Sequence, residues 1–195
     1  RGLKEAKANE AKAVILDMDT PGGTLASAEE MMLLLLDAEM PTYTFVNPRA
    51  ISAGAMIAMA TDEIIMTPTA LIGDAMPIMM SPVPMGGAQE IPDGLREKIL
   101  SPTLALMRSA AQEKGHDPEI GIAMIRPEFD LWIGNHHVCP KGELLTLTSE
   151  EAVEPIQEDG SPLLAKAIAS DLEECLSKIG LQGTKIVNIS ISESE

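Results

Sequence analysis

The sequence is short of basic residues and of aromatic residues, and each shortage excludes a class of function. Lysine and arginine number 14 against 30 acidic residues, which gives a formal net charge of -16 at pH 7. This charge repels phosphate backbones and anionic lipid, so we expect no nucleic-acid partner. One Trp, one Tyr and two Phe leave little surface for stacking on bases or sugars, and 13 Met must help the aliphatic residues to fill the core.

Cysteine is also scarce. The two cysteines, Cys139 and Cys175, match no metal-binding or redox spacing, and they fit either a disulfide or two buried thiols. His136 and His137 stand beside Cys139, but adjacent residues of a strand point to opposite faces of a sheet, so these side chains do not make a four-ligand zinc site. We therefore expect no metal site and no cofactor.

Long apolar runs are absent. The longest, at residues 31–36 and 53–60, are much shorter than the roughly 20 residues that a membrane-spanning helix needs. The chain begins at Arg1 with neither a methionine nor a signal-like segment, as a trimmed or processed fragment would. Localisation cannot be read from the ends of this chain.

An alternation of strand and helix patterns predicts the fold. A length of 195 residues suits one domain, and we assign residues 141–195 to its C-terminal α/β part. Apolar runs predict strands at 13–18, 42–46 and 63–66, with a helix through 31–36 and another at 52–60 between them. This β-α-β-α-β order is typical of an α/β protein with a mostly parallel sheet and crossover helices. Residues 31–36 are apolar nearly all round, as in a helix that is buried or at an interface.

Capping and periodicity patterns predict the remaining elements. We expect an exposed helix at 1–12, a short strand at 71–74, an amphipathic helix at 97–115, a short helix from Asp117-Pro118, strands at 129–133 and 143–148, a helix at 171–179 and a last strand at 184–191. Three pairs have the spacing of capping boxes: Ser27 with Glu30, Thr148 with Glu151, and Ser170 with Glu173.

Residues 75–92 predict a long loop, because they hold four prolines and paired glycines. The loop also contains Met76, Met79, Met80 and Met85. Long ordered loops are often lids or binding segments, and methionine suits a surface that accepts varied apolar partners. A loop whose methionines only patch the core fits the pattern equally well.

Ser52 lies where a strand pattern passes into a helix pattern. The first amides of a helix have no intrahelical partner and carry the positive end of the dipole, so an oxyanion formed near Ser52 would find hydrogen-bond donors. The alternative is that Ser52 simply caps the helix, since serine is among the best N-cap residues. On this stretch alone, the capping role is the more common one.

A nucleophilic serine needs a base, and the sequence offers few. The three histidines lie at least 64 positions beyond Ser52, and the only lysines between Ser52 and Gly115 are Lys98 and Lys114. A lysine base must be neutral, and lowering a pKa of ~10.4 by about three units costs on the order of 4 kcal/mol, which only a desolvated site can supply. Lys114 belongs to a polar helix end that stabilises a cation, so Lys98 is the better candidate.

Plainer roles fit these residues as well. Lys98 also fits the charged, solvated first turn of a helix. Ser101-Pro102 resembles an N-cap followed by the first helical residue, and a helix that began there would leave Lys98 about one turn before its start. The Gly22-Gly23 turn suits a simple β-to-α connection, although its glycines allow positive φ and a close approach by another backbone or a ligand. A glycine amide of this turn could join the Ala53 amide in binding an oxyanion; the GxSxG motif is absent.

Several segments together resemble a known family. They are 19–23 (DTPGG), 48–55 (PRAISAGA), 62–66 (DEIIM), 106–117 (LMRSAAQEKGHD) and 141–153 (KGELLTLTSEEAV). In these segments, which span most of the chain, the sequence resembles the NfeD-type, ClpP-class membrane-bound serine proteases, the partners of stomatin-like proteins. The resemblance implies a ClpP/crotonase-like α/β fold, with Ser52 as nucleophile, Lys98 as general base, and the amides of Gly23 and Ala53 as the oxyanion hole.

The resemblance also implies a biological setting. It implies a homo-oligomer, commonly built from dimers, and a membrane-associated protein of which this piece is a soluble, extracytoplasmic domain, without the family's membrane helices and small β-barrel domain. The implied substrates are apolar peptide segments, such as the tail of a stomatin-like protein. For these we expect contacts from Gly22, Met76 and Met79.

Two other functions remain open. A crotonase-like acyl-CoA enzyme would use the same kind of oxyanion hole without a serine nucleophile, although the negative charge of the chain disfavours the phosphates of CoA. A non-catalytic module would grip an apolar peptide with the methionine-rich loop and would not turn it over.

Overall fold

A six-stranded sheet forms the centre of the molecule. The computed structural model describes residues 1–80, 88–89 and 93–189. The strands of the sheet are β1 (Val14–Thr20), β2 (Thr42–Ile51), β3 (Glu63–Met66), β4 (Leu71–Gly73), β9 (Thr146–Thr148) and β10 (Ala167–Ile168). Their order is β10-β3-β2-β4-β9, with β1 also paired to β2, and every pair is parallel except β4 with β9. The predicted α/β fold with a mostly parallel sheet is confirmed.

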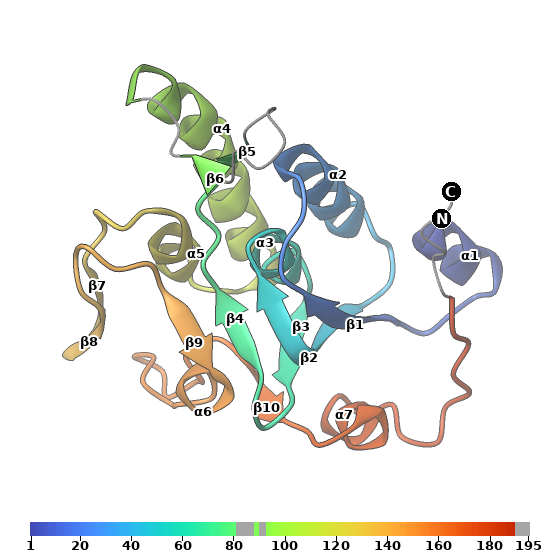
Figure 1. The fold of residues 1–195 in the computed structure, drawn as a ribbon. Helices are drawn as coiled ribbons and strands as arrows, with labels where there is room; N and C mark the ends of the chain where they lie inside the picture. The colour runs from blue at the N-terminus through green and yellow to red at the C-terminus, as the bar shows by residue number, and fades with distance from the viewer. Residues whose placement is uncertain (81–87, 90–92, 190–195) are drawn as a thin grey trace.

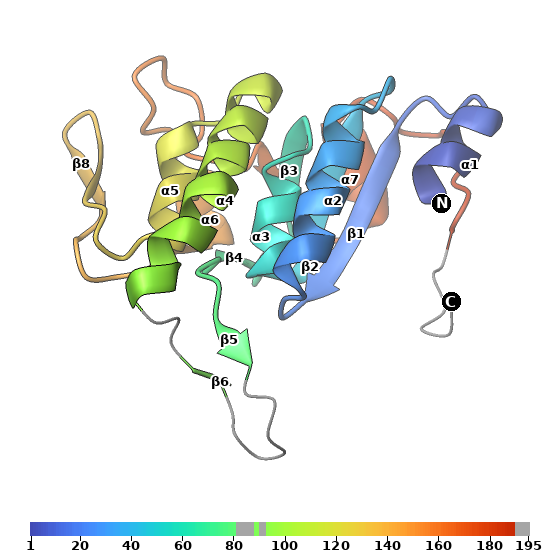
Figure 2. The ribbon, with the colours of Figure 1, turned by 90° about the horizontal axis from the view of Figure 1, so that it is seen from above.

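Helices cover both faces of this sheet (Figures 1 and 2). One face carries α2 (Leu25–Leu36), α3 (Ala53–Ala58), α4 (Asp93–Lys114) and α5 (Pro118–Ile125), and the other carries α7 (Leu172–Lys178). Neighbouring strand residues enter different cores because side chains alternate across a strand. Val46 packs with the large core under α2 to α5, whereas Phe45 packs with Ile65 and Cys175 beneath α7.

The remaining elements are short. They are α1 (Gly2–Ala8), β5 (Met79–Met80), β6 (Ala88–Gln89), β7 (Leu131–Ile133), β8 (His136–Cys139) and α6 (Ser149–Ala152). β5 pairs with β6 and β7 with β8, both antiparallel. β5 and β6 lie within the stretch predicted as a loop, of which 81–87, with Met85, and 90–92 lie outside the described residues.

Several predicted element ends are wrong. Helix α4 begins at Asp93 and contains Pro102, so Ser101-Pro102 does not start it, because the buried stripe formed by Leu100 and Leu104 continues the helix through the proline. Helix α2 is capped by Thr24, whose side chain accepts from the Ser27 amide, rather than by Ser27. Helix α7 is capped by Asp171 rather than Ser170.

The other predicted elements have mixed outcomes. Strand β3, the capping box of Thr148 with Glu151 and the start of α5 after Asp117 are confirmed. Residues 184–189 form no strand, and 190–191 lie outside the described residues. Helix α2 is not buried all round, because Met31, Leu33 and Leu34 are exposed.

No helix in the described part of the chain combines the length and the apolar character needed to cross a membrane. Both cysteines are buried free thiols rather than a disulfide. Burial, aided by the nearby Asp17 carboxylate, raises the pKa of Cys175 to about 11. Among the described residues, no three His, Cys, Asp or Glu side chains gather closely enough to hold a metal ion.

Candidate active site

Ser52 stands between the end of β2 and the start of α3, in a backbone conformation that few serines adopt. Its φ is 57° and its ψ is -118°. A positive φ in a residue with a Cβ is uncommon and costs free energy, of order 1–3 kcal/mol in sparsely populated regions. Such strain persists only where the surrounding structure holds it, and it is found most often at functional sites.

The Ser52 side chain does not cap the helix that it precedes. Ser52 occupies the N-cap position of α3, yet its hydroxyl makes no capping hydrogen bond. The Ser52 amide is fixed instead, because it donates to the Gly73 carbonyl at 3.0 Å. Gly73 has a φ of +142°, and a Cβ there would collide with the Leu145 carbonyl oxygen. The simple capping role, which the sequence favoured locally, is therefore not what this hydroxyl does.

The turn after β1 lies directly against Ser52. Gly22 has a φ of +135°, and a Cβ built on it would stand 2.9 Å from Ser52 Cβ and 3.3 Å from Ser52 Oγ. Thr20 braces the turn, since its hydroxyl accepts from the Gly22 amide at 3.1 Å and lies 3.0 Å from the Gly22 carbonyl. The close approach and positive φ expected of this glycine pair are thus present at Gly22.

Two amides beside Ser52 are free to donate. Within the described part of the chain, neither the Gly23 amide nor the Ala53 amide forms a hydrogen bond. A Cβ built on Gly23 would be 3.7 Å from the Cβ of Ala53, so the two residues are neighbours although 30 positions separate them. Unpaired backbone donors beside a nucleophile are the elements of an oxyanion hole.

Helix α3 is held tightly against the sheet. All of its residues, Ala53–Ala58, are buried. A Cβ on Gly54 would come within 2.5 Å of Thr20 Cγ2 and 3.3 Å of the Met18 sulfur, so only glycine allows α3 to approach β1 this closely. The same threonine therefore braces the Gly22 turn and lies against helix α3, which follows Ser52.

An ion pair joins the two strand ends that carry the site. Arg49 Nε lies 2.8 Å from Asp19 Oδ1, with both side chains about half exposed at 48% and 47%. The hydrogen bond and charge of Asp19 raise the pKa of Arg49. Asn47 reaches Asp17 at 3.3 Å just below this pair. Asp19 precedes the Gly22 turn and Arg49 precedes Ser52, so the ion pair couples the two halves of the site.

The sequence did not reveal this pair or the roles of Thr20 and Gly73. A signal for the ion pair was present, because Asp19 and Arg49 follow two strands that we expected to be parallel neighbours. The register of β1 against β2, in which Thr20 lies opposite Ala50, brings them together. The contact between Gly73 and Ser52 carries no sequence signal, since it depends on how β4 meets the end of β2.

The two candidate lysines occupy opposite ends of α4. Lys98 is exposed near the start of the helix, and no hydrogen bond or ion pair joins it to another described residue. Lys114 is only 8% exposed and its Nζ lies 3.0 Å from Asp62 Oδ1. The start of α4 lies at the same end of the molecule as the carboxyl ends of β1 and β2 (Figure 2). Of the predicted loop contacts, Met76 is half-buried, and Met79 belongs to β5.

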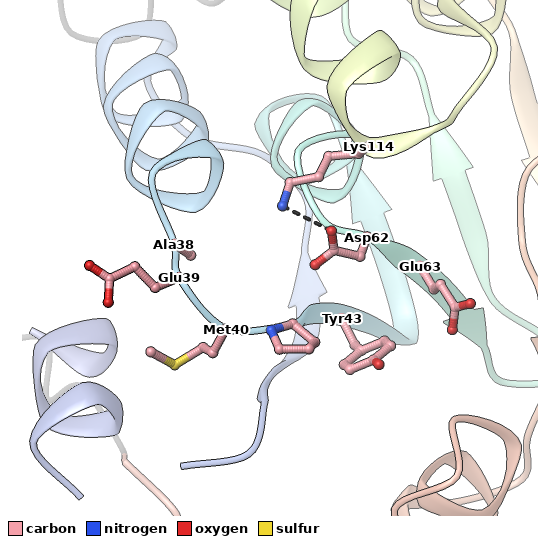
Figure 3. Close-up of a pocket in the computed structure, with 8 residues that line it drawn as sticks. Ala38, Glu39, Met40, Tyr43, Asp62, Glu63 and Lys114 are labelled. Atoms are coloured by element: carbon pink, nitrogen blue, oxygen red, sulfur yellow. Dashed lines mark hydrogen bonds and ion pairs between the residues drawn. The ribbon is translucent and has the colours of Figure 1, made fainter. Parts of the chain in front are cut away.

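At the opposite end of the sheet, the polar groups are satisfied (Figure 3). Asp62 accepts from the Thr42 amide at 2.7 Å, from the Thr42 hydroxyl at 3.0 Å and from Lys114. Burial works to raise the pKa of Asp62, but these hydrogen bonds outweigh it and lower the pKa. A pocket of about 470 Å³ borders this group, with Asp62, Tyr43 and Lys114 in its wall. Every charge of this cluster has a partner.

Solved structures of known proteins share the fold of this chain. The mostly parallel α/β sheet, with a serine at a strand-to-helix junction, matches solved structures of a ClpP-like protease. The structure of 1510-N, a membrane-bound stomatin-specific protease, solved as a lysine-to-alanine mutant with a substrate peptide, matches with a TM-score of 0.70 and 27% identity, over 91% of this chain and 70% of that chain. A serine-to-alanine mutant of the same protease matches with a TM-score of 0.69 and 27% identity, over 91% of this chain and 74% of that one.

Sequence comparison gives the family. The model of the NfeD1b N-terminal domain matches residues 1–189, so the chain belongs to this family. Membrane protein NfeD1b of Bacillus subtilis is 35% identical over 95% of this chain, and membrane-bound protease PH1510 of Pyrococcus horikoshii is 28% identical over 95%. The chain spans 38% and 36% of the lengths of these two relatives. The resemblance to NfeD-type proteins is confirmed, and the relatives are named as membrane proteins.

Proposed function

We propose that this chain is the protease domain of a membrane-associated serine peptidase. One observation carries the proposal: Ser52 is held in a strained conformation, with its hydroxyl not used for capping, beside two unpaired amides. Relatives in sequence and in structure are named as proteases, and one is named as specific for stomatin. This supports the assignment of acyl-transfer chemistry to the same fold here.

In the proposed mechanism, Ser52 Oγ attacks the scissile carbonyl of a peptide bound against the Gly22 turn. The carbonyl oxygen becomes an oxyanion, which the amides of Gly23 and Ala53 stabilise by hydrogen bonding and through the positive end of α3. The absence of a Cβ at Gly22 gives the substrate backbone access to Ser52 Oγ. Water then hydrolyses the acyl-serine and regenerates the hydroxyl.

Lys98 is the proposed general base. It would accept the Ser52 proton and return it to the leaving amine, which requires a neutral amine. In the free chain the Lys98 side chain is exposed to water. We therefore propose that a bound peptide removes water from Lys98, so that the base forms together with the substrate complex. The alternative base, Lys114, is already held by Asp62 at the far end of α4.

The proposed substrates are apolar peptide segments such as the tails of stomatin-like proteins. Exposed apolar side chains lie on the segments around the site: Ile78 is 54% exposed just before β5, and Leu95 is 48% exposed in the first turn of α4. Together with Gly22, Met76 and Met79, they would form the substrate-binding surface. We further propose that the chain forms a homo-oligomer and lies outside the cytoplasm.

A serine-directed fluorophosphonate probe tests the proposal. We expect the probe to label the chain at Ser52 and a Ser52→Ala variant to lose both labelling and peptidase activity, while Ser101→Ala, which changes an exposed serine of α4, keeps both. Loss of activity by at least about a thousandfold is typical for removal of a nucleophile. Full peptidase activity in Ser52→Ala would overturn the proposal. Peptide binding without turnover in the unmodified chain would support the binding-module alternative.

A further inference from the structure

A second pocket lies far from Ser52, at the amino-terminal end of the sheet. Its volume is about 540 Å³, and its walls come from the end of α4, the β7–β8 hairpin and the loop at 157–164. Figures 1 and 2 show this loop running close to the hairpin, beyond the last turn of α4. Gly115 in its wall is 17 residues from Lys98, a distance of about 25 Å along a helix. The pocket therefore belongs to a separate surface.

The only tryptophan of the chain stands in the wall of this pocket. The sequence contains few aromatic residues, and Trp132 is one of them. Its side chain is 50% exposed and is therefore not used to fill the core. One indole face is covered by His137, whose ring stacks at 4.2 Å with an angle of 5° between the planes. Asp130 fixes both rings, since it accepts from Trp132 Nε1 at 3.0 Å and pairs with His137 Nε2 at 2.8 Å. The Lys141 amide holds the same carboxylate at 3.0 Å.

This arrangement orders the indole before any ligand arrives. A large aromatic side chain that is exposed and already fixed is the kind of residue that carries binding energy at an interface, because little conformational entropy remains to be lost. Its uncovered face is free to accept a flat or cationic group.

The formally charged side chains in the wall of this pocket are all acidic. Asp117, Glu119, Glu158 and Asp159 line the pocket, and within the described part of the chain its wall includes no lysine or arginine. One oxygen of Asp117 accepts from the Glu119 amide, and one of Asp159 accepts from the Ser161 amide, both at 2.9 Å. Among the described residues, the carboxylates of Glu119 and Glu158 form no hydrogen bond and can bind a ligand. An aromatic surface with an acidic rim fits a cation.

We propose that this pocket docks an arginine-bearing segment of a protein partner. Guanidinium is planar, stacks on an indole face and binds carboxylates through two parallel hydrogen bonds, so it suits both components of the wall better than an ammonium group does. The acidic rim disfavours an anionic membrane. A second copy of this chain, with a net charge of -16, is also disfavoured as the occupant.

Fluorescence of the single tryptophan tests the proposal directly. The Ser52→Ala chain, which avoids any cleavage, would be titrated with the peptide acetyl-Gly-Arg-Gly-Arg-Gly-amide at low salt. We expect saturable quenching, weaker binding of the lysine analogue by about threefold or more, and no binding of the glutamate analogue. Salt should weaken the binding.

Two variants separate the components of the site. Binding of a dye-labelled arginine peptide, followed by anisotropy, should weaken by about fivefold in Trp132→Leu and by about tenfold in Glu158→Gln/Asp159→Asn. The double variant Glu10→Gln/Glu30→Gln removes the same charge from exposed sites elsewhere and should bind normally. Absence of binding, equal affinity for the arginine and lysine peptides, or equal losses in the pocket variant and this control would each overturn the proposal.

Discussion

The two ends of the central sheet differ in how their polar groups are used. At the carboxyl end, Ser52 is strained and its hydroxyl makes no capping bond, and the amides of Gly23 and Ala53 form no hydrogen bond with any residue that the structure describes. At the amino end, Asp62 and Lys114 are paired and hydrogen-bonded (Figure 3). Unpaired polar groups and backbone strain cost stability, so a fold keeps them where they serve chemistry. The paired Asp62 and Lys114 stabilise the fold, and the carboxyl end, with Ser52, is the candidate for catalysis.

The largest expected difference between the ends comes from the two lysines. Lys98→Ala should lower peptidase activity by about a hundredfold to ten-thousandfold, the range for a general base, with little change in the free energy of unfolding, because Lys98 is exposed. Steady-state kinetics and urea denaturation measure the two effects. Full activity in Lys98→Ala would show that another group is the base.

The glycine turn provides the next test of the carboxyl end. Gly22→Ala adds a methyl group that would lie 2.9 Å from Ser52 Cβ, at a φ of +135° that alanine rarely adopts. Because the turn also positions the Gly23 amide, we expect kcat/KM to fall by about a hundredfold or more. Labelling by the fluorophosphonate probe should slow in parallel. Gly94→Ala, at a position with open space around the Cα, is the matched control.

Sequence patterns were enough for the fold and for the parts of the site that adjoin each strand end. The alternation of strands and helices predicted the parallel sheet, and the turn after β1 was predicted to lie near Ser52. This works because the carboxyl ends of neighbouring parallel strands share one edge of the sheet. Local patterns also predicted the helix N-cap at Asp117 and the capping box that Thr148 forms with Glu151.

Features that depend on contacts between distant segments were not predictable. The φ of Ser52 depends on Gly73, which accepts its amide, and Gly73 depends in turn on its contact with Leu145. The exposure of Lys98 depends on where α4 begins, and the sequence placed that start wrongly. Pro102 suggested a helix start, but tertiary packing of Leu100 and Leu104 overrides the local preference.

A substitution of Lys114, at the amino end, should lower stability and leave activity unchanged, which is the reverse of the result expected for Lys98→Ala. Lys114→Met keeps most of the side-chain volume but leaves Asp62 with only its Thr42 partners. Breaking a fully buried pair costs about 3–5 kcal/mol, and because Asp62 is 40% exposed we expect about 1–2 kcal/mol. Urea denaturation measures the loss. Peptidase activity below the unfolding transition should stay near that of the unmodified chain, and a large fall in kcat would contradict the division between the two ends.

A smaller effect on activity is expected from the ion pair across the site. Asp19→Asn and Arg49→Gln should each lower kcat by about fivefold, with little change in KM, because the pair aligns the Gly22 turn with Ser52 and is half exposed. The charge-reversed double variant Asp19→Arg/Arg49→Asp should recover part of the loss. The exposed pair of Lys7 and Glu39 serves as a control, since Glu39→Gln should leave kcat unchanged. Additive losses in the double variant would exclude a positioning role for the pair.

The smallest expected effect concerns pH and His116. Its Nε2 lies 2.8 Å from the Thr61 carbonyl, which it can meet only as an N–H donor. Burial lowers the pKa of His116 below its ordinary value of 6.5, although this hydrogen bond and Asp62 oppose the shift. Above pH 6.5 the imidazole is neutral in both the folded and the unfolded chain, so it carries no pH-dependent penalty. As the pH falls through 6.5, the unfolded chain binds a proton that the folded chain resists, and stability decreases.

Replacing His116 should therefore flatten the pH dependence of stability. Between pH 7.5 and 5.5, the free energy of unfolding of the unmodified chain should fall more steeply than that of His116→Gln, by less than about 1.4 kcal/mol per pH unit, the limit for one proton. Urea denaturation at each pH gives both slopes, and His136→Gln, at an exposed histidine, should leave the slope unchanged. Asp62 does not interfere, because its lowered pKa places its loss of stability below pH 3.8. Parallel curves for the unmodified chain and His116→Gln would show that burial does not lower the pKa of His116 in the folded chain, and the proposed link between its burial and stability would then fail.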